Sequence, residues 1–329
     1  MPKLVSRIKV FLMVSLLVLI PLADGYSQQQ ELKKVTFMPS WIPQEQFAGY
    51  YMAKEKGIYK KYGLDVTIKS SAGETQVINA LKKNEIDFGV MFLFSAIMER
   101  DKGTKLVNVG QIFQRCNMMF VAKKKSGIKT IKDFNGKKIG IWKTIAKELT
   151  TGFLKKNNIN AEIVVFNSGI QSFLKDAVDV IIMMNYNEYK RMLNSGINDD
   201  EVNKFYFYDY NVNFPEDGIY CMESTYDKDP VLCRKFVAAS MEGWEYALGH
   251  IDETIQIMNK YKEISKISYN RSHSIWMLNS MKNIIHPPGK NVANGILLKS
   301  DFDSITEFLF NNKFIFSKPL FNDFYKGGN

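Results

Sequence analysis

The chain has 329 residues, a formal net charge of +10 at pH 7, 46% hydrophobic residues and three cysteines. Its length is about twice that of a typical domain, so two lobes are expected. The lysine pairs lie among acidic residues, which is typical of solvated faces and argues against nucleic-acid binding. The cysteine count is odd, and no CxxC or Cys/His spacing occurs, which argues against a disulfide framework and against a zinc site.

The N-terminus has the pattern of a secretory signal peptide. Three basic residues precede an apolar run from Val10 to Leu22, and small residues suited to cleavage follow, either Ala23 with Gly25 or Gly25 with Ser27. The run is shorter than the roughly 20 residues that span a bilayer. Residues 1–27 are therefore predicted to be removed, which leaves an exported chain located in the periplasm or secreted.

The rest of the chain alternates between strand and helix patterns and ends in helices. Such an alternation predicts an α/β fold with mostly parallel sheets. The predicted strands are 35–38, 64–68, 86–91, 106–111, 118–122, 138–142, 161–166, 178–183, 204–208 and 219–222, and the main predicted helices are 46–56, 73–83, 94–101, 145–157, 170–175, 187–194, 230–249, 251–261, 269–283 and 300–311.

No Pro/Gly-rich linker divides the two expected lobes. The chain is therefore expected to pass between them in extended segments near 113–123 and 208–222. Paired crossovers of this kind suit hinged closure around a ligand.

Five segments appear in an order that resembles a known family: FAGYYMAKEKGIYKKYGLDV, ETQVINALKKNEIDFGV, SGIKTIKDFNGKKIGI, MMNYNEY and FPEDGIYC. Over about residues 34–265 the chain resembles the periplasmic substrate-binding proteins of ABC importers. The nearest branch holds the thiamine-pyrimidine precursor binders and the thiamine-pyrimidine synthases, while sulfonate, taurine and nitrate binders are more distant.

This resemblance implies a type II periplasmic-binding-protein fold. Two α/β lobes with mixed, mostly parallel sheets would be joined by two hinge crossovers, with the ligand in the cleft between them. Lobe 1 would comprise residues 28–118 and 213–329, and lobe 2 residues 119–212.

Aromatic residues after the first strand are the first candidates for ligand contact. Trp41 follows that strand, where a cleft loop is expected, and Phe47 and Tyr50 lie on one face of the next helix. Such side chains could stack on a flat heteroaromatic ring. A core position for the tyrosine remains the alternative.

Two predicted helix starts form a second group of candidates. Gly73, Glu74 and Thr75 open one helix, and Thr144 opens another in the other lobe. Free N–H groups at a helix start favour an anion or a carbonyl group. Ordinary helix capping is the alternative for each.

The ends of later strands supply the remaining candidates for ligand contact. Carboxylates in a closing cleft can accept N–H bonds from an amidine or aminopyrimidine, whereas a solvated turn is the alternative for the acidic pair in FPEDGIYC. These candidates are Met91 and Phe92 on the cleft floor, Asn185, Tyr186 and Glu188 after the buried strand, and Glu216 and Asp217 before the return strand.

The chain departs from the synthases at two places. Phe47 stands where the resemblance puts a histidine that supplies the pyrimidine and helps to hold iron, and Cys221 is what remains of a cysteine cluster. No enzymatic activity, cofactor or metal is therefore expected. The three cysteines could hold one disulfide and one buried thiol, or three buried thiols.

The sequence thus predicts a monomeric receptor that captures a small N-containing heteroaromatic solute by lobe closure. Its partners would be an ABC permease and ATPase complex, with no nucleic acid. The alternatives are a sulfonate- or nitrate-type binder, a sensor subunit, and a thiamine-pyrimidine synthase.

Overall fold

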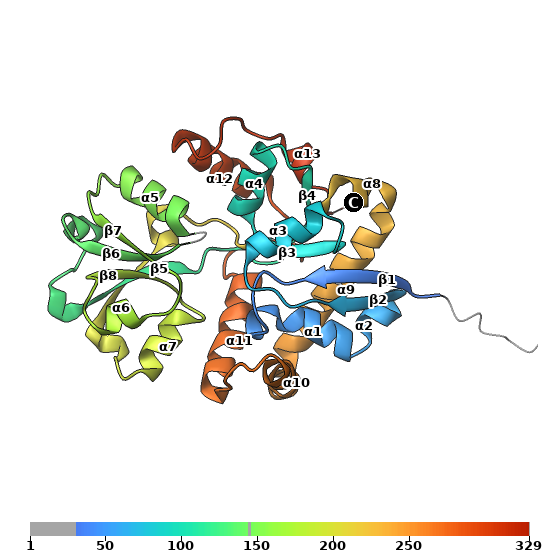
Figure 1. Cartoon of the computed structure of the whole chain (residues 1–329), viewed down its shortest axis with the longest axis horizontal. Helices are drawn as coiled ribbons and strands as arrows, with labels where there is room; N and C mark the ends of the chain where they lie inside the picture. The colour runs from blue at the N-terminus through green and yellow to red at the C-terminus, as the bar shows by residue number, and fades with distance from the viewer. Residues whose placement is uncertain (1–30, 144–145, 329) are drawn as a thin grey trace, which may run out of the picture. The chain divides into compact units, whose positions relative to one another are not determined.

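The described residues, 31–143 and 146–328, are built around two five-stranded sheets in the computed structural model (Figure 1). Residues from Leu32 onward form one compact unit, to which both sheets belong. The predicted signal peptide, residues 1–27, and Thr144 lie outside the described residues.

The first sheet has the strand order β2-β1-β3-β10-β4. Its strands β1, β2 and β3 pair in parallel, and β10 runs antiparallel to both of its neighbours. The register places Asp217 opposite Phe92 and Phe37 opposite Phe88. The strands are β1 Lys33–Met38, β2 Leu64–Ile68, β3 Phe88–Phe92, β4 Leu106–Gln111 and β10 Asp217–Met222.

The second sheet repeats this plan in the order β7-β6-β8-β5-β9. Its antiparallel strand, β5, directly follows β4 of the first sheet, and β9 is followed by β10, so residues 112–117 and 207–216 connect the two sheets. The mixed, mostly parallel sheets and the two connections confirm the predicted fold class. The strands are β5 Met118–Lys123, β6 Lys138–Trp142, β7 Glu162–Phe166, β8 Val180–Met184 and β9 Val202–Tyr206.

The helices follow the predicted pattern, with three short additions (α2, α8 and α13). Among the described residues, none of the helices combines the length and hydropathy of a membrane-spanning segment. The helices are α1 Ala48–Glu55, α2 Ile58–Lys61, α3 Glu74–Lys82, α4 Leu93–Asp101, α5 Ala146–Lys156, α6 Gln171–Leu174, α7 Glu188–Asn194, α8 Glu223–Lys228, α9 Pro230–Gly249, α10 Ile251–Ile264, α11 Arg271–Ile285, α12 Lys299–Asn311 and α13 Phe321–Phe324.

Strand β9 lies two residues closer to the N-terminus than the predicted strand 204–208. Strand β9 ends at Tyr206, and a 3-10 helix, Phe207–Tyr210, takes the residues predicted to continue it. Aromatic residues, which favour strands, occur along the whole run KFYFYDY. Its composition therefore does not show at which residue the pairing with β5 stops.

Helix α1 packs on α9 at very short range. A Cβ atom built on Gly243 would lie 2.2 Å from the carbonyl oxygen of Gly49, and one built on Gly49 would lie 2.3 Å from the Trp244 ring. The two backbones can approach this closely because neither glycine carries a side chain.

This packing corrects the placement expected for Phe47 and Tyr50. Both side chains are buried, at 0% and 1% exposure, and the Tyr50 ring lies 4.6 Å from Phe37 and 6.1 Å from Trp244 between ring centroids. The apolar face of the helix therefore belongs to the core of the first sheet.

All three cysteines, Cys116, Cys221 and Cys233, are free and buried. Burial raises the pKa of the Cys116 thiol well above its usual range. A hydrogen bond with Cys233, together with burial, raises the pKa of Cys221 likewise. Of the two arrangements left open by the sequence, the structure therefore has three buried thiols.

Candidate functional site

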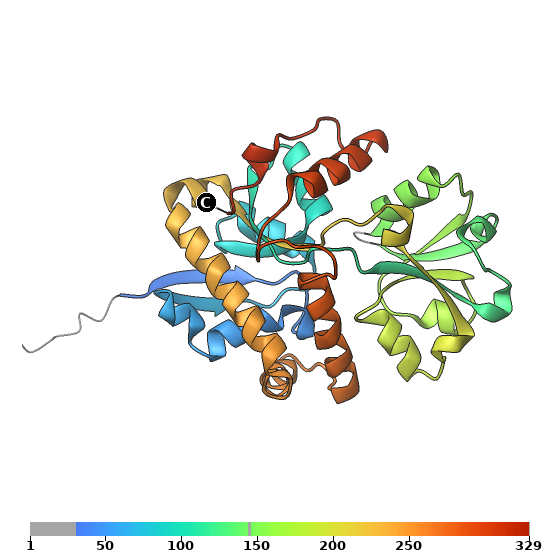
Figure 2. The same ribbon diagram turned by 180° about the vertical axis from the view of Figure 1, so that it is seen from behind.

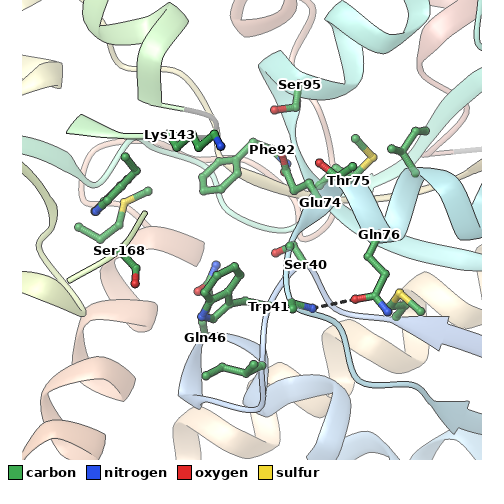
Figure 3. Close-up of a pocket in the computed structure, with 18 of the residues that line it drawn as sticks. Ser40, Trp41, Gln46, Glu74, Thr75, Gln76, Phe92, Ser95, Lys143 and Ser168 are labelled. Carbon is green, nitrogen blue, oxygen red and sulfur yellow. Dashed lines mark hydrogen bonds between the residues drawn. The ribbon is translucent and has the colours of Figure 1, made fainter. Parts of the chain in front are cut away.

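A cavity of about 1160 Å³ opens where parallel strands of both sheets end. Trp41 follows β1, Phe92 ends β3, Lys143 follows β6, and Ser168 lies after β7 (Figure 3). Ligands of open α/β sheets bind beyond the carboxyl ends of the strands. The cavity is the candidate site for this reason and because both sheets contribute to its walls.

Trp41 and the start of α3 form one wall of the cavity. The indole is 38% exposed, unlike most large aromatic side chains of the chain. Behind it lies Gly73, whose φ of +148° suits glycine and whose Cβ position would be 3.5 Å from the Trp41 ring. An exposed indole backed by glycine offers a flat apolar surface to a planar ligand.

Glu74 opens α3 and is nine-tenths buried in the same wall. Its Oε1 accepts a hydrogen bond from the backbone N–H of Phe92, which ties the start of α3 to the end of β3. Burial disfavours the charged form and raises the pKa of Glu74 to about 8. At neutral pH this wall therefore carries a protonated carboxyl group, which can both donate and accept hydrogen bonds.

The opposite wall comes from the segment after β8, where Tyr186, Asn187 and Glu188 line the cavity. Glu188 Oε2 accepts from the Met184 N–H at 3.2 Å, and its Oε1 accepts from Asn187 Nδ2 at 2.9 Å. Burial also raises the pKa of Glu188. Amide and carboxyl groups therefore stand side by side on this wall, fixed by local hydrogen bonds.

Glu216 and Asp217 lie beneath the cavity and do not line it. Their exposures are 2% and 1%, so the predicted cleft carboxylates are buried and the alternative of a solvated turn is also wrong. Glu216 Oε1 accepts from the Asn117 N–H at 2.6 Å, and Asp217 Oδ2 accepts from Gln46 Nε2 at 2.8 Å. Asp217 is thus connected to the cavity by its hydrogen bond with Gln46, which does line the cavity.

Burial raises the pKa of Glu216 to about 8 and that of Asp217 to about 7. Neither Glu216 Oε2 nor Asp217 Oδ1 has a hydrogen-bond partner among the described residues. A carboxyl group left half-satisfied in this way is best accommodated in its neutral form.

These raised pKa values predict that stability falls as pH rises. Above the ordinary carboxyl pKa the unfolded chain releases the proton while the folded chain keeps it, so folding becomes less favourable up to about pH 8. Glu216→Gln, which keeps the acceptor for Asn117, is expected to reduce the loss between pH 5 and pH 8 by roughly 2–3 kcal/mol. Urea unfolding across this pH range measures the effect.

Asp65→Asn provides the control, because Asp65 is an exposed carboxyl group on β2. This variant is expected to keep the wild-type pH profile. A Glu216→Gln profile that parallels the wild type would show that Glu216 is ionised in the folded protein.

The structure brings eight of the predicted site residues together in one cavity. Asn185 does not line the cavity, and its backbone carbonyl oxygen accepts a hydrogen bond from Trp276 Nε1. Thr144 lies outside the described residues. The eight are Trp41, Gly73, Glu74, Thr75, Met91, Phe92, Tyr186 and Glu188.

Several lining residues escaped the sequence-based prediction. Asn167 and Ser168 directly follow β7, so the rule that ligands lie beyond strand ends could have identified them. Gln46 begins an aromatic helical stretch, and only its bond to Asp217, 171 residues away, shows why a polar side chain stands there.

Comparisons with known proteins agree on the family. Residues 44–254 match the family described as NMT1/THI5 like. The riboflavin-binding protein RibY of Chloroflexus aurantiacus is 27% identical over 245 residues, which are 71% of this chain and 68% of the relative. The 4-amino-5-hydroxymethyl-2-methylpyrimidine phosphate synthase of Schizosaccharomyces pombe is 22% identical over 107 residues, 32% of this chain and 31% of the enzyme. The chain thus matches about a third of that synthase.

Solved structures agree on the fold. The periplasmic aliphatic sulphonate binding protein SsuA of Escherichia coli superposes with a TM-score of 0.69 at 15% identity, covering 87% of this chain and 94% of that one. At this identity the match shows the fold alone. The chain therefore belongs to the NMT1/THI5-like family and has the fold of the periplasmic binding proteins.

Proposed function

We propose that this protein is an exported solute-binding receptor of an ABC importer that captures an N-containing heteroaromatic compound in the cavity. The observation that carries the proposal is the cavity itself, in which Trp41 and Phe92 offer ring faces while Gln46, Glu74 and Asn187 offer hydrogen-bonding groups. Flat rings with N–H and C=O edges suit both kinds of surface.

The cavity is large enough for a ligand bigger than a single pyrimidine ring. Its volume of about 1160 Å³ lies just above the range of about 300–1,000 Å³ that is common for small-molecule sites. A relative named for riboflavin binding supports a fused-ring ligand of the flavin type, beside the thiamine-pyrimidine precursors. The neutral form of Glu74 favours an uncharged ring edge over a strongly cationic ligand.

The proposed mechanism is closure of two lobes, residues 28–118 with 213–329 and residues 119–212. The segments 112–117 and 207–216, which join the sheets, are the proposed hinges. A ligand shifts the balance toward the closed form only through its higher affinity for that form. The closed monomer would then dock on a permease and ATPase complex after export directed by the predicted signal peptide.

Phe47 favours solute binding over synthesis. Its side chain is fully buried in the core at the position where the resemblance places the histidine substrate of the synthases. The partial match to the synthase chain therefore supports shared architecture, and we assign no catalytic residues.

A ligand screen tests the proposal. Thermal unfolding of the mature protein is measured with riboflavin, 4-amino-5-hydroxymethyl-2-methylpyrimidine, taurine and nitrate. A true ligand at 100 times its Kd is expected to stabilise the fold by about 2.7 kcal/mol, and stacking is expected to quench riboflavin fluorescence. Stabilisation by taurine or nitrate alone would instead favour the sulfonate- or nitrate-type receptor.

Uptake measurements separate transport from sensing. In cells that lack the cognate permease, uptake of the identified ligand is expected to disappear. Uptake that persists without the permease, together with a lost transcriptional response when the receptor is deleted, would indicate a sensor subunit.

A further inference from the structure

Helix α11 reaches from the helices around the first sheet to the second sheet's ligand wall. It packs on α9 and α10, and it contacts α7, which follows β8 (Figure 2). Within it, Ser274 Oγ accepts from Lys262 Nζ at 3.2 Å, and Lys262 forms a buried ion pair with Glu45, the neighbour of Gln46. One side of α11 is therefore anchored to the segment that carries Gln46 into the cavity.

The other side of α11 holds the segment after β8. Trp276 Nε1 donates to the Asn185 carbonyl oxygen at 2.8 Å, and His273 Nε2 lies 3.1 Å from Asn187 Oδ1. The Trp276 ring lies 6.2 Å from the ring of Tyr189. We call these contacts of His273 and Trp276 with residues 185–189 the α11 clasp.

The clasp determines how Asn187 faces the cavity. Burial lowers the pKa of His273 to about 4, so its ring is neutral at pH 7 and donates from Nε2 to Asn187 Oδ1. Because Asn187 Oδ1 accepts this bond, the side-chain amide is oriented with Nδ2 toward Glu188. Nδ2 donates to Glu188 Oε1 at 2.9 Å. Both Asn187 and Glu188 line the cavity, so a contact made outside it fixes two hydrogen-bonding groups inside it.

We propose that His273 and Trp276 of lobe 1 are positioning residues of the ligand site, which hold the 185–188 wall of lobe 2 in its binding conformation, so that the proposed hinge motion leaves this contact in place. The inference rests on the proposed function and adds residues from the part of the chain beyond 44–254, the region that matches the family. If two related proteins had the same residues after β8 but only one had the clasp, the side chains of these residues would therefore be oriented differently in the two cavities.

Hydrogen exchange in the ligand-free, full mature chain tests the clasp directly. In Trp276→Phe and His273→Leu, amides of residues 184–191 are expected to exchange about fivefold faster, the equilibrium factor of roughly one net hydrogen bond. His273→Gln keeps an N–H donor and is expected to exchange like the wild type. Asn279→Ala, an exposed substitution on the same helix, is the matched control.

Peptides from β1 and β3 report on the rest of the fold in the same experiment. If Trp276→Phe also speeds exchange in the β1 and β3 peptides, its effect is a general loss of stability. The test then rests on the two variants of the half-exposed His273, because His273→Gln keeps the N–H donor and His273→Leu removes it. Unchanged exchange over 184–191 in His273→Leu would overturn the clasp.

Riboflavin affinity, measured by fluorescence quenching, tests the link from clasp to ligand. The Kd is expected to rise about fivefold in Trp276→Phe and in His273→Leu, and to recover in His273→Gln. Faster exchange with an unchanged Kd would overturn the positioning role while leaving the proposed function intact. If the wild type binds none of the screened compounds, the proposed function fails for those ligands, and the exchange data still decide whether α11 holds the wall.

Discussion

Trp41→Ala is expected to weaken binding of the proposed heteroaromatic ligand at least 30-fold while leaving the protein folded. Loss of a central aromatic contact commonly costs about 2 kcal/mol or more of binding free energy, which corresponds to this factor. Trp41 is 38% exposed and backed by Gly73, so its removal leaves no hole in the core. Titration calorimetry gives the affinity, and circular dichroism checks the fold.

Phe316→Ala is the control for this substitution. Phe316 is 92% exposed and does not line the cavity, so its removal changes the aromatic content without touching the site. Trp41→Phe should retain part of the affinity, because a smaller ring can still stack. An alanine variant whose Kd stays within twofold of the wild type would remove Trp41 from the site.

Gly243→Ala is expected to destabilise the fold by about 3 kcal/mol, the upper range for an overpacked core. The new methyl group would lie 2.2 Å from the Gly49 carbonyl oxygen and 2.6 Å from the Ala53 Cβ. The Gly49 oxygen and the Ala53 Cβ are fixed to the backbone of α1 and cannot rotate away. Helix α1 must therefore move away from α9 to relieve the overlap. Urea unfolding measures the loss as a lower transition midpoint.

Gly249→Ala on the same helix is the matched control. Apart from its chain neighbours and the backbone of α9 itself, no heavy atom of residues 31–143 or 146–328 lies within 4 Å of the Cβ position at Gly249, so alanine there is expected to be neutral or to stabilise by up to about 1 kcal/mol through helix propensity. If Gly243→Ala also stays within 1 kcal/mol of the wild type, the two helices are not packed as closely as described.

The sequence predicts the individual elements well where apolar runs end at clear signals. Strands Leu64–Ile68 and Leu106–Gln111 and helix Pro230–Gly249 begin and end where expected, because turn residues or a proline mark their limits. Local patterns do not reveal that β5 and β10 each run antiparallel in their sheets. That arrangement depends on pairings between residues far apart in the chain, such as Ala122 with Val180 and Gly218 with Gln111.

The site is predictable in part, for a related reason. Residues that line the cavity directly after a strand, such as Trp41 and Glu188, can be found from their position alone. A helical stripe such as Phe47 and Tyr50 shows that one face is apolar but not what covers it, and here Trp244 does. Glu216 resembles a turn residue in sequence, and the N–H group that it meets in the interior belongs to Asn117, on the other connection between the sheets.

The burial of all three native thiols makes the protein convenient for distance measurements. Thiolates are the reactive species, and the raised pKa values of Cys116 and Cys221 leave few of them at pH 7. Cysteines introduced for the exposed Asp65 on β2 and Glu162 on β7 would therefore take up maleimide dyes selectively, without mutation of the native ones. Energy transfer between the two dyes would then report directly on the proposed closure of the two lobes.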